Sequence, residues 1–178
     1  MNPSTGSAFW AHGIRLSHDE EHELARHKSA ALGRRLHERG VNTLAGARLY
    51  LEAAGRARLG RAVVSSSTRT LPLLELAGLA SLVEARVDAE QIAEGNLRSR
   101  PAPDLVMRGC ELLRVDPADA VSFAHTVDGV AAAQAAGVRV VGVSAEARER
   151  ERLLAFGAEA VTAGLAGLLD RRVIAAAA

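Results

Sequence analysis

Residues 121–143 read VSFAHTVDGVAAAQAAGVRVVGV, and this stretch decides the expected fold. The apolar run Val121–Phe123 predicts a buried strand, and the alanine-rich segment after it predicts a helix that ends at Gly137. A second buried strand is predicted from the run Val138–Val143. Strand, helix and strand in this order form one unit of a parallel sheet. Ligands of such sheets bind at the carboxyl ends of the strands, so we expect a functional site at His125.

Composition limits the classes of protein to which the chain can belong. Its 178 residues are enough for one domain, or for one domain with a small appendage. Hydrophobic residues make up 48% but aromatic residues only 3%, so Ala, Val and Leu must form the core. The 22 basic and 21 acidic residues give a formal charge of +1, which offers no electrostatic basis for nucleic-acid binding. The single Cys110 excludes an internal disulfide, and its apolar surroundings predict a core residue.

Neither a membrane segment nor a secretion signal is predicted. Charged residues interrupt every apolar run before it reaches the length of a membrane-spanning helix. The N-terminal sequence MNPSTGSAFW has no basic segment leading into an apolar one. We therefore expect a cytoplasmic protein without a membrane partner.

Helices alternate with short strands along most of the chain. Helices are expected to begin at Ser17, at Asn42 or Thr43, at Thr70, at a cap formed by Asp104, and near Ala145, with a last helix through Leu165–Leu169. The first of them ends at Gly40. Further strands are expected in the run RAVVSSS (61–67), at Ala85–Val87 and at Ala160–Thr162. This alternation predicts the α/β class, with a parallel sheet covered on both faces.

A group of hydroxyl and basic side chains is a candidate anion site. Ser65, Ser66 and Ser67 follow a predicted strand and precede the helix at Thr70, where backbone N–H groups can bind an anion. An ordinary strand-to-helix turn explains the same serines. Positive charge near them is expected from Arg69, Arg98 and Arg100, although Arg100 also fits a solvated loop.

The order and spacing of these segments resemble the haloacid dehalogenase-like (HAD-like) superfamily, in its β-phosphoglucomutase-like branch. The resemblance runs from about Glu23 to Leu169 and rests on short motifs: Arg26-His27-Lys28, Ala45-Gly46, Val63–Ser67, Ser99–Asp104, Phe123–Thr126, Asp128–Val130 and Val140–Val143. It implies a Rossmannoid parallel sheet with helices on both faces. It also implies a HAD-like α/β core over residues 46–178 and a partial helical cap over residues 1–45.

The same resemblance suggests roles for individual residues. Ser65 matches the hydroxyl that holds the phosphoryl oxygens, and Lys28 matches a cap lysine that contacts the substrate phosphate. Arg100 stands where the family has a charge-neutralising lysine. Ala124 and His125 stand where the family has the acidic pair that helps to hold Mg²⁺. Because Mg²⁺ prefers oxygen ligands, we expect neither a metal site nor another cofactor.

The family's nucleophile, an Asp-x-Asp motif on a first strand, has no counterpart before Ser17. In the family this strand lies between the strand that ends at Ser65 and the strand Val121–Phe123. Without it, the backbone groups of both neighbours lose a partner. We expect one of three arrangements: the two strands pair directly, another segment or subunit fills the position, or the sequence is a fragment.

Three functions are compatible with these observations. The favoured one is a degenerate HAD-like protein that has lost Mg²⁺-dependent phosphoryl transfer and binds an anionic or phosphorylated small molecule, binds a partner, or serves a different reaction. The second is a sugar-phosphate mutase or phosphatase completed by another chain or a longer native protein. The third is a structural protein whose homo-oligomer covers the vacant strand position. His125 is a general base or weak metal ligand, or the remnant of an unused acidic site.

Overall fold

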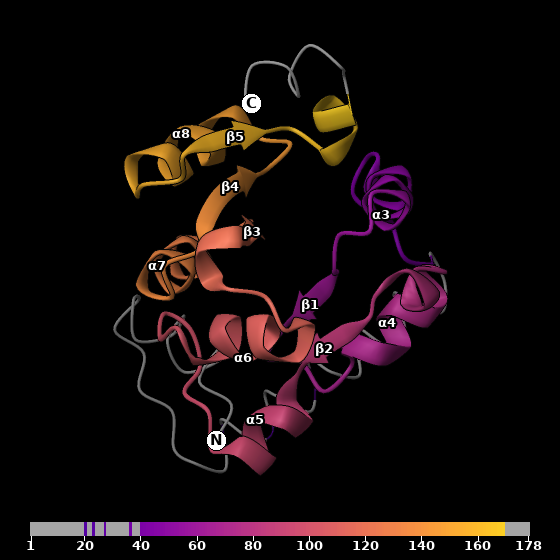
Figure 1. The fold of residues 1–178 in the computed structure, drawn as a ribbon, viewed down its shortest axis with the longest axis vertical. Helices are drawn as coiled ribbons and strands as arrows, with labels where there is room; N and C mark the ends of the chain where they lie inside the picture. The colour runs from indigo at the N-terminus through magenta and orange to yellow at the C-terminus, as the bar shows by residue number, and fades with distance from the viewer. Residues whose placement is uncertain (1–19, 21–22, 24–26, 28–35, 37–39, 170–178) are drawn as a thin grey trace. The chain divides into compact units, whose positions relative to one another are not determined.

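A computed structural model describes residues 40–169 together with Glu20, Glu23, His27 and Leu36 (Figure 1). The chain divides into two compact units, residues 1–42 and 43–178. In the first unit, the four isolated described residues are helical, and the Gly40 N–H donates to the Leu36 carbonyl at 3.0 Å. Gly40 has a φ of +67°, a left-handed conformation typical of a helix end. The predicted helix end at Gly40 is therefore confirmed.

The second unit is built of helices and short strands in alternation. Its helices are α3 (Ala47–Arg56), α4 (Thr70–Leu76), α5 (Ala89–Gly95), α6 (Asp104–Leu113), α7 (Val127–Ala135) and α8 (Ala147–Ala155), with 3₁₀ turns at Ala80–Leu82, Pro117–Asp119 and Leu165–Leu169. Its strands are β1 (Ala62–Val64), β2 (Ala85–Val87), β3 (Val121–Ala124), β4 (Arg139–Val143) and β5 (Ala160–Thr162). All five predicted strands are present. Helix α5 was not predicted from the sequence, and the last predicted helix is a 3₁₀ turn.

Local capping explains where several helices begin and end. Gly78 and Gly137, with φ of +65° and +73°, follow α4 and α7 in the left-handed conformation that favours glycine. The Thr126 hydroxyl accepts a hydrogen bond from the Gly129 N–H at 3.1 Å and caps α7. Two predicted starts are wrong. Gly46 rather than Asn42 or Thr43 precedes α3, and Asp104 is the first residue of α6 rather than its cap.

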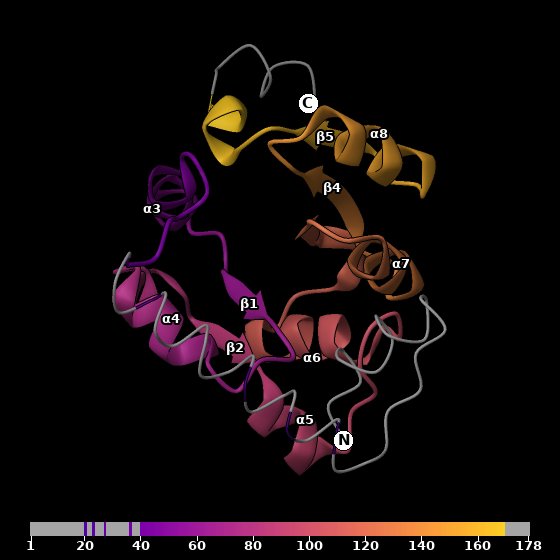
Figure 2. The ribbon, with the colours of Figure 1, turned by 180° about the vertical axis from the view of Figure 1, so that it is seen from behind.

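The five strands form two parallel sheets, and the α/β fold class is confirmed (Figures 1 and 2). One sheet pairs β1 with β2, and Val63 lies opposite Arg86. The other has the order β3-β4-β5, and Phe123 lies opposite Val141. Helix α6 packs on β1 and β2, while α7 packs on β3 and β4. Within the described residues β1 and β3 are not paired, so direct pairing, the first of the three expected arrangements, does not occur there.

The hydrophobic core lies around the three-stranded sheet. Val130 and Leu153 have no exposed surface, and Val140 is 1% exposed. Cys110 belongs to the same cluster, and burial raises the pKa of its thiol. Its predicted place in the core is confirmed. Among the described helices, none is long and apolar enough to span a membrane.

Candidate functional site

The loop that follows β1 is shaped by its own hydroxyl groups. The Ser65 Oγ accepts the Ser67 N–H at 3.2 Å, and the Ser67 Oγ accepts the Arg69 N–H at 3.1 Å. The Thr70 hydroxyl donates to the Ser67 carbonyl at 2.9 Å. Ser65, Ser66, Ser67 and Arg69 are all half-buried. Because a hydroxyl group has one donor and two acceptor positions, the Ser65 and Ser67 O–H groups still have a hydrogen to donate to a ligand.

The loop before α6 contains two arginines in different electrostatic situations. Arg98 donates to the Asp104 carboxylate from Nε, at 3.0 and 3.2 Å, and from Nη2, at 2.7 Å. In the described part of the chain, the half-buried Arg100 has no ion-pair partner for its guanidinium. The Arg100–Pro101 peptide bond is cis. The expectation that Arg98 adds free positive charge to the site is therefore wrong, whereas Arg100 keeps its charge available.

The pKa values of this ion pair reflect the same contacts. Hydrogen bonds from the Arg98 side chain and backbone lower the pKa of the Asp104 carboxyl to about 2, and the same pair raises the pKa of Arg98. Asp104 is therefore ionised at neutral pH. This ion pair was not predicted from the sequence. The signal that could have found it is an opposite charge six residues away, across a segment with two prolines.

Neither Ala124, the last residue of β3, nor His125 after it has a side-chain oxygen that could bind a metal ion. Ala124 is 5% exposed, and the His125 side chain is exposed. Mg²⁺, which the family resemblance implies, does not fit a buried methyl group and an imidazole as its ligands. Over residues 40–169 and the isolated described residues, no group of three or more His, Cys, Asp or Glu side chains is placed to hold a metal ion.

The predicted site residues lie on three separate segments. Ser65 to Arg69 form one hydrogen-bonded loop at the end of β1. Arg100 precedes α6, the helix that packs on β1 and β2. His125 follows β3 and so belongs to the other sheet. Lys28 lies outside the described residues. The structure therefore brings together the serine loop and Arg69, and it places Arg100 and His125 on other elements.

One edge of β1 and one edge of β3 have no strand partner among the described residues. The Ser65 N–H donates to the Val87 carbonyl, so by alternation the backbone groups of Ala62 and Val64 point away from β2. The Ser144 N–H donates to the Thr162 carbonyl, and the same alternation directs the backbone groups of Val121 and Phe123 away from β4. The side chains of Val121 and Phe123 are 42% and 36% exposed. Tyr50 of α3 contacts the Phe123 ring edge-on, with ring centroids 5.2 Å apart.

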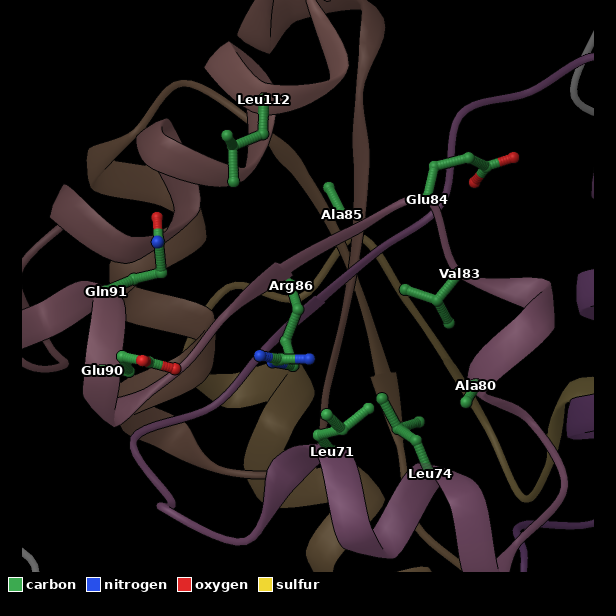
Figure 3. A pocket seen from close by; sticks show the side chains of 10 residues that line it. All are labelled: Leu71, Leu74, Ala80, Val83, Glu84, Ala85, Arg86, Glu90, Gln91 and Leu112. Atoms are coloured by element: carbon green, nitrogen blue, oxygen red, sulfur yellow. The ribbon is translucent and has the colours of Figure 1, made fainter.

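A hollow of about 390 Å³ lies elsewhere, beside β2 (Figure 3). The residues that line it are Leu71, Leu74, Ala80, Val83, Glu84, Ala85, Arg86, Glu90, Gln91 and Leu112. Arg86 pairs with the buried Asp88, and Glu84 pairs with Arg61. None of the lining residues is a predicted site residue, so the hollow is distinct from the candidate anion site.

Comparison with curated proteins gives a sequence relative. No protein-family model matches the chain. The chain is 39% identical over 149 residues to a β-phosphoglucomutase of Mycobacterium bovis, and the alignment covers 82% of this chain and 57% of the relative. The chain therefore spans little more than half the length of this relative.

Comparison with solved structures gives the same superfamily. A HAD-like protein of unknown function from Agrobacterium tumefaciens has a TM-score of 0.73 and 29% identity, over 96% of this chain and 75% of that one. A HAD family hydrolase from Deinococcus radiodurans, solved with bound phosphate and sodium, has a TM-score of 0.69 and 27% identity, over 98% and 74% of the two chains. The parallel α/β architecture and these similarities agree with the resemblance seen in the sequence motifs. This chain is a HAD-like protein that resembles the β-phosphoglucomutase branch of that superfamily.

Proposed function

We propose that this chain binds a phosphorylated small molecule and does not by itself carry out Mg²⁺-dependent phosphoryl transfer. The observation that carries the proposal is Arg100, a half-buried guanidinium without an ion-pair partner in the described part of the chain. Burying a charge is unfavourable unless an opposite charge or hydrogen bonds compensate it. A guanidinium group suits phosphate because its planar N–H groups can donate to two oxygens at once.

The serine loop supports the same ligand class. The Ser65 and Ser67 hydroxyl groups retain a hydrogen to donate, and the loop leads directly into α4. Among the similar proteins, the Deinococcus radiodurans hydrolase was solved with bound phosphate, and the Mycobacterium bovis relative is a β-phosphoglucomutase. A sugar phosphate is therefore the first ligand class to test.

Loss of phosphoryl transfer is proposed from the residues at the end of β3. Ala124 supplies no ligand atom, and His125 supplies nitrogen where Mg²⁺ prefers oxygen. Metal ions and positioned donors provide most of the stabilisation in phosphoryl transfer. We therefore assign no catalytic step to this chain alone, and no role in anion binding to His125, which follows β3 in the other sheet.

Calorimetric titration with inorganic phosphate and with glucose 1-phosphate tests the binding proposal. We expect binding by the wild-type protein and a loss of about tenfold or more in affinity for Arg100→Ala, because a charge-assisted hydrogen bond is removed. Ser65→Ala should weaken binding less. Arg139→Ala, which removes an exposed arginine at the start of β4, is the matched control and should leave affinity unchanged. Absence of binding to either ligand would overturn the proposal.

A second candidate function is a sugar-phosphate mutase or phosphatase that another polypeptide segment completes. It is favoured by the edges of β1 and β3, whose backbone groups at Val64 and Phe123 have no described strand partner. An added parallel strand would satisfy these groups and cover the exposed side chains of Val121 and Phe123.

Turnover separates the two candidates. Incubation with β-glucose 1-phosphate and Mg²⁺ should give no product if the first candidate is correct. Metal-dependent turnover that Ser65→Ala abolishes would establish the second candidate instead. Amide hydrogen exchange adds a structural measurement, because a strand or second copy at this position would protect the Val64 and Phe123 N–H groups from exchange.

A further inference from the structure

The loop between α5 and α6 is fastened at both ends. At its start, the Arg98 backbone N–H donates to the Asp104 Oδ2 at 2.9 Å. The Arg98 side chain donates hydrogen bonds to the same carboxylate from Nε and Nη2. Between them, the Ala102 N–H donates to the Ser99 carbonyl at 3.1 Å, and two prolines restrict the backbone. We name the Arg98–Asp104 contact the loop latch.

Asp104 is a rigid attachment point for this latch. It is the first residue of α6, and its side chain is only 18% exposed, against 74% for Arg98. A carboxylate in the first turn also interacts favourably with the helix dipole. The next residue, Leu105, has no exposed surface, and a Cβ on Gly109 would lie 3.4 Å from the Val64 Cγ2. The helix that carries Asp104 is therefore packed closely on β1.

The latch also leaves the two arginines of the loop in different electrostatic states. The ion pair with Asp104 neutralises Arg98, the more exposed of the two. Arg100 lies between the two latch residues in the sequence; it is half-buried and has no ion-pair partner in the described chain. A flexible loop would lose conformational entropy on binding an anion, whereas a fastened loop has already lost it. We propose that Arg98 and Asp104 are positioning residues, which hold Arg100 ready for the anion. This inference rests on the proposed function.

The sign of one substitution separates positioning from simple electrostatics. Asp104→Asn removes a negative charge and frees the positive charge of Arg98. If only net charge mattered, inorganic phosphate would bind more tightly. If the latch positions Arg100, phosphate should bind about three- to fivefold more weakly despite the added positive charge, in line with the usual strength of exposed ion pairs.

A charge exchange tests the latch itself. The double variant Arg98→Asp/Asp104→Arg keeps the net charge and can restore an ion pair, so it should recover phosphate affinity relative to either single variant. Amide exchange at Ala102, whose N–H donates to the Ser99 carbonyl, should be faster in Asp104→Asn and slower again in the double variant. Because a carboxylate at the start of α6 is itself favourable, the exchange data and affinity are compared at a temperature where all variants are folded.

Each outcome decides one question. Weaker phosphate binding in both Asp104→Asn and Arg100→Ala supports the positioning role. Unchanged or tighter binding in Asp104→Asn, together with weaker binding in Arg100→Ala, overturns the positioning role and leaves the proposed function intact. If wild-type protein and Arg100→Ala bind phosphate equally, or not at all, the proposed function fails and the positioning role fails with it.

Discussion

The two parallel sheets share one architecture but are stabilised in different ways. Around β3, β4 and β5 the stabilisation comes from apolar burial, with Val130, Val140 and Leu153 almost completely enclosed. Around β1 and β2, Val87 and Leu105 are also completely buried, but three ion pairs are added to this apolar contact: Arg61–Glu84, Arg86–Asp88 and Arg98–Asp104. Apolar burial is insensitive to pH and tolerates no loss of volume, whereas ion pairs depend on both protonation and geometry. The candidate anion residues belong mainly to the region with the ion pairs.

The largest effect is expected at the centre of the apolar region. Leu153→Ala removes a completely buried side chain from α8 and should lower the free energy of unfolding by about 2–5 kcal/mol. Urea denaturation measures it. Leu154→Ala is the matched control, because Leu154 is the next residue and is 45% exposed; its effect should stay within about 0.5 kcal/mol. Equal effects would contradict the packing of Leu153 in the hydrophobic core, where α8 contacts β4 and β5.

The second-largest loss of stability is expected where β4 and α8 pack closely together. A Cβ on Gly142 would lie 2.9 Å from the Leu153 Cβ and 3.0 Å from the Val161 Cγ1. Gly142→Ala should therefore destabilise the protein by about 1–3 kcal/mol through overpacking. Gly167→Ala, where the nearest atom lies at 3.6 Å, is the control and should be tolerated. Thermal denaturation that ranks Gly167→Ala as the worse variant would contradict this packing.

In the other sheet, replacing Arg61 should cause a smaller and more local loss of stability. Its Nη1 donates to the Leu51 carbonyl at 3.0 Å, while its Nε and Nη2 donate to the Glu84 carboxylate. Arg61→Ala should lower the Tm less than Leu153→Ala does and should speed amide exchange in β1 and β2 but not in β4. Arg61→Lys keeps the charge without the planar fork and should fall between wild type and Arg61→Ala. An unchanged Tm would mean that these contacts contribute nothing.

Acid should weaken the ion-pair region before the apolar one. Arg61 lowers the pKa of Glu84 below its ordinary 4.5, and Arg98 lowers that of Asp104 from 3.8 to about 2. Because both values are lower in the folded state, the unfolded state binds protons first as the pH falls. The stabilisation is complete above about pH 4.5 and is lost as the pH falls towards about 2.

Urea midpoints at pH 7 and pH 3 measure this loss. The double variant Glu84→Gln/Asp104→Asn should show a smaller difference between the two pH values than the wild type. A control double variant, Asp119→Asn/Glu151→Gln, neutralises two exposed acids and should behave as the wild type. A control that flattens the pH dependence equally would contradict the assignment to the two ion pairs.

The smallest effect is expected at His125. Its side chain is exposed at the end of β3, so His125→Asn should change the free energy of unfolding by no more than about 0.5 kcal/mol. Urea denaturation at pH 7 checks this value. A larger loss would show that the imidazole has a structural partner and would remove it from the candidate site.

Several elements could be predicted because their signals are local. The apolar runs of β1, β3 and β4 and the glycines that follow α4 and α7 are visible in short windows of sequence. Helix α5 was missed because it is short and its capping residue, Asp88, also pairs with Arg86. The start of α3 was misplaced because Asn42 and Thr43 are favourable capping residue types, and the choice of Gly46 instead depends on surrounding packing.

The sequence by itself determined the α/β class, the strand order along the chain and the family resemblance, because periodicity and motif spacing are properties of neighbouring residues. Only the tertiary structure decided that β1 and β3 remain unpaired among the described residues, and that Arg98 is neutralised while Arg100 is not. These facts depend on which groups meet across loops and sheets. A carboxylate six residues away along the chain changes the charge of a site only when the fold brings it within hydrogen-bonding distance.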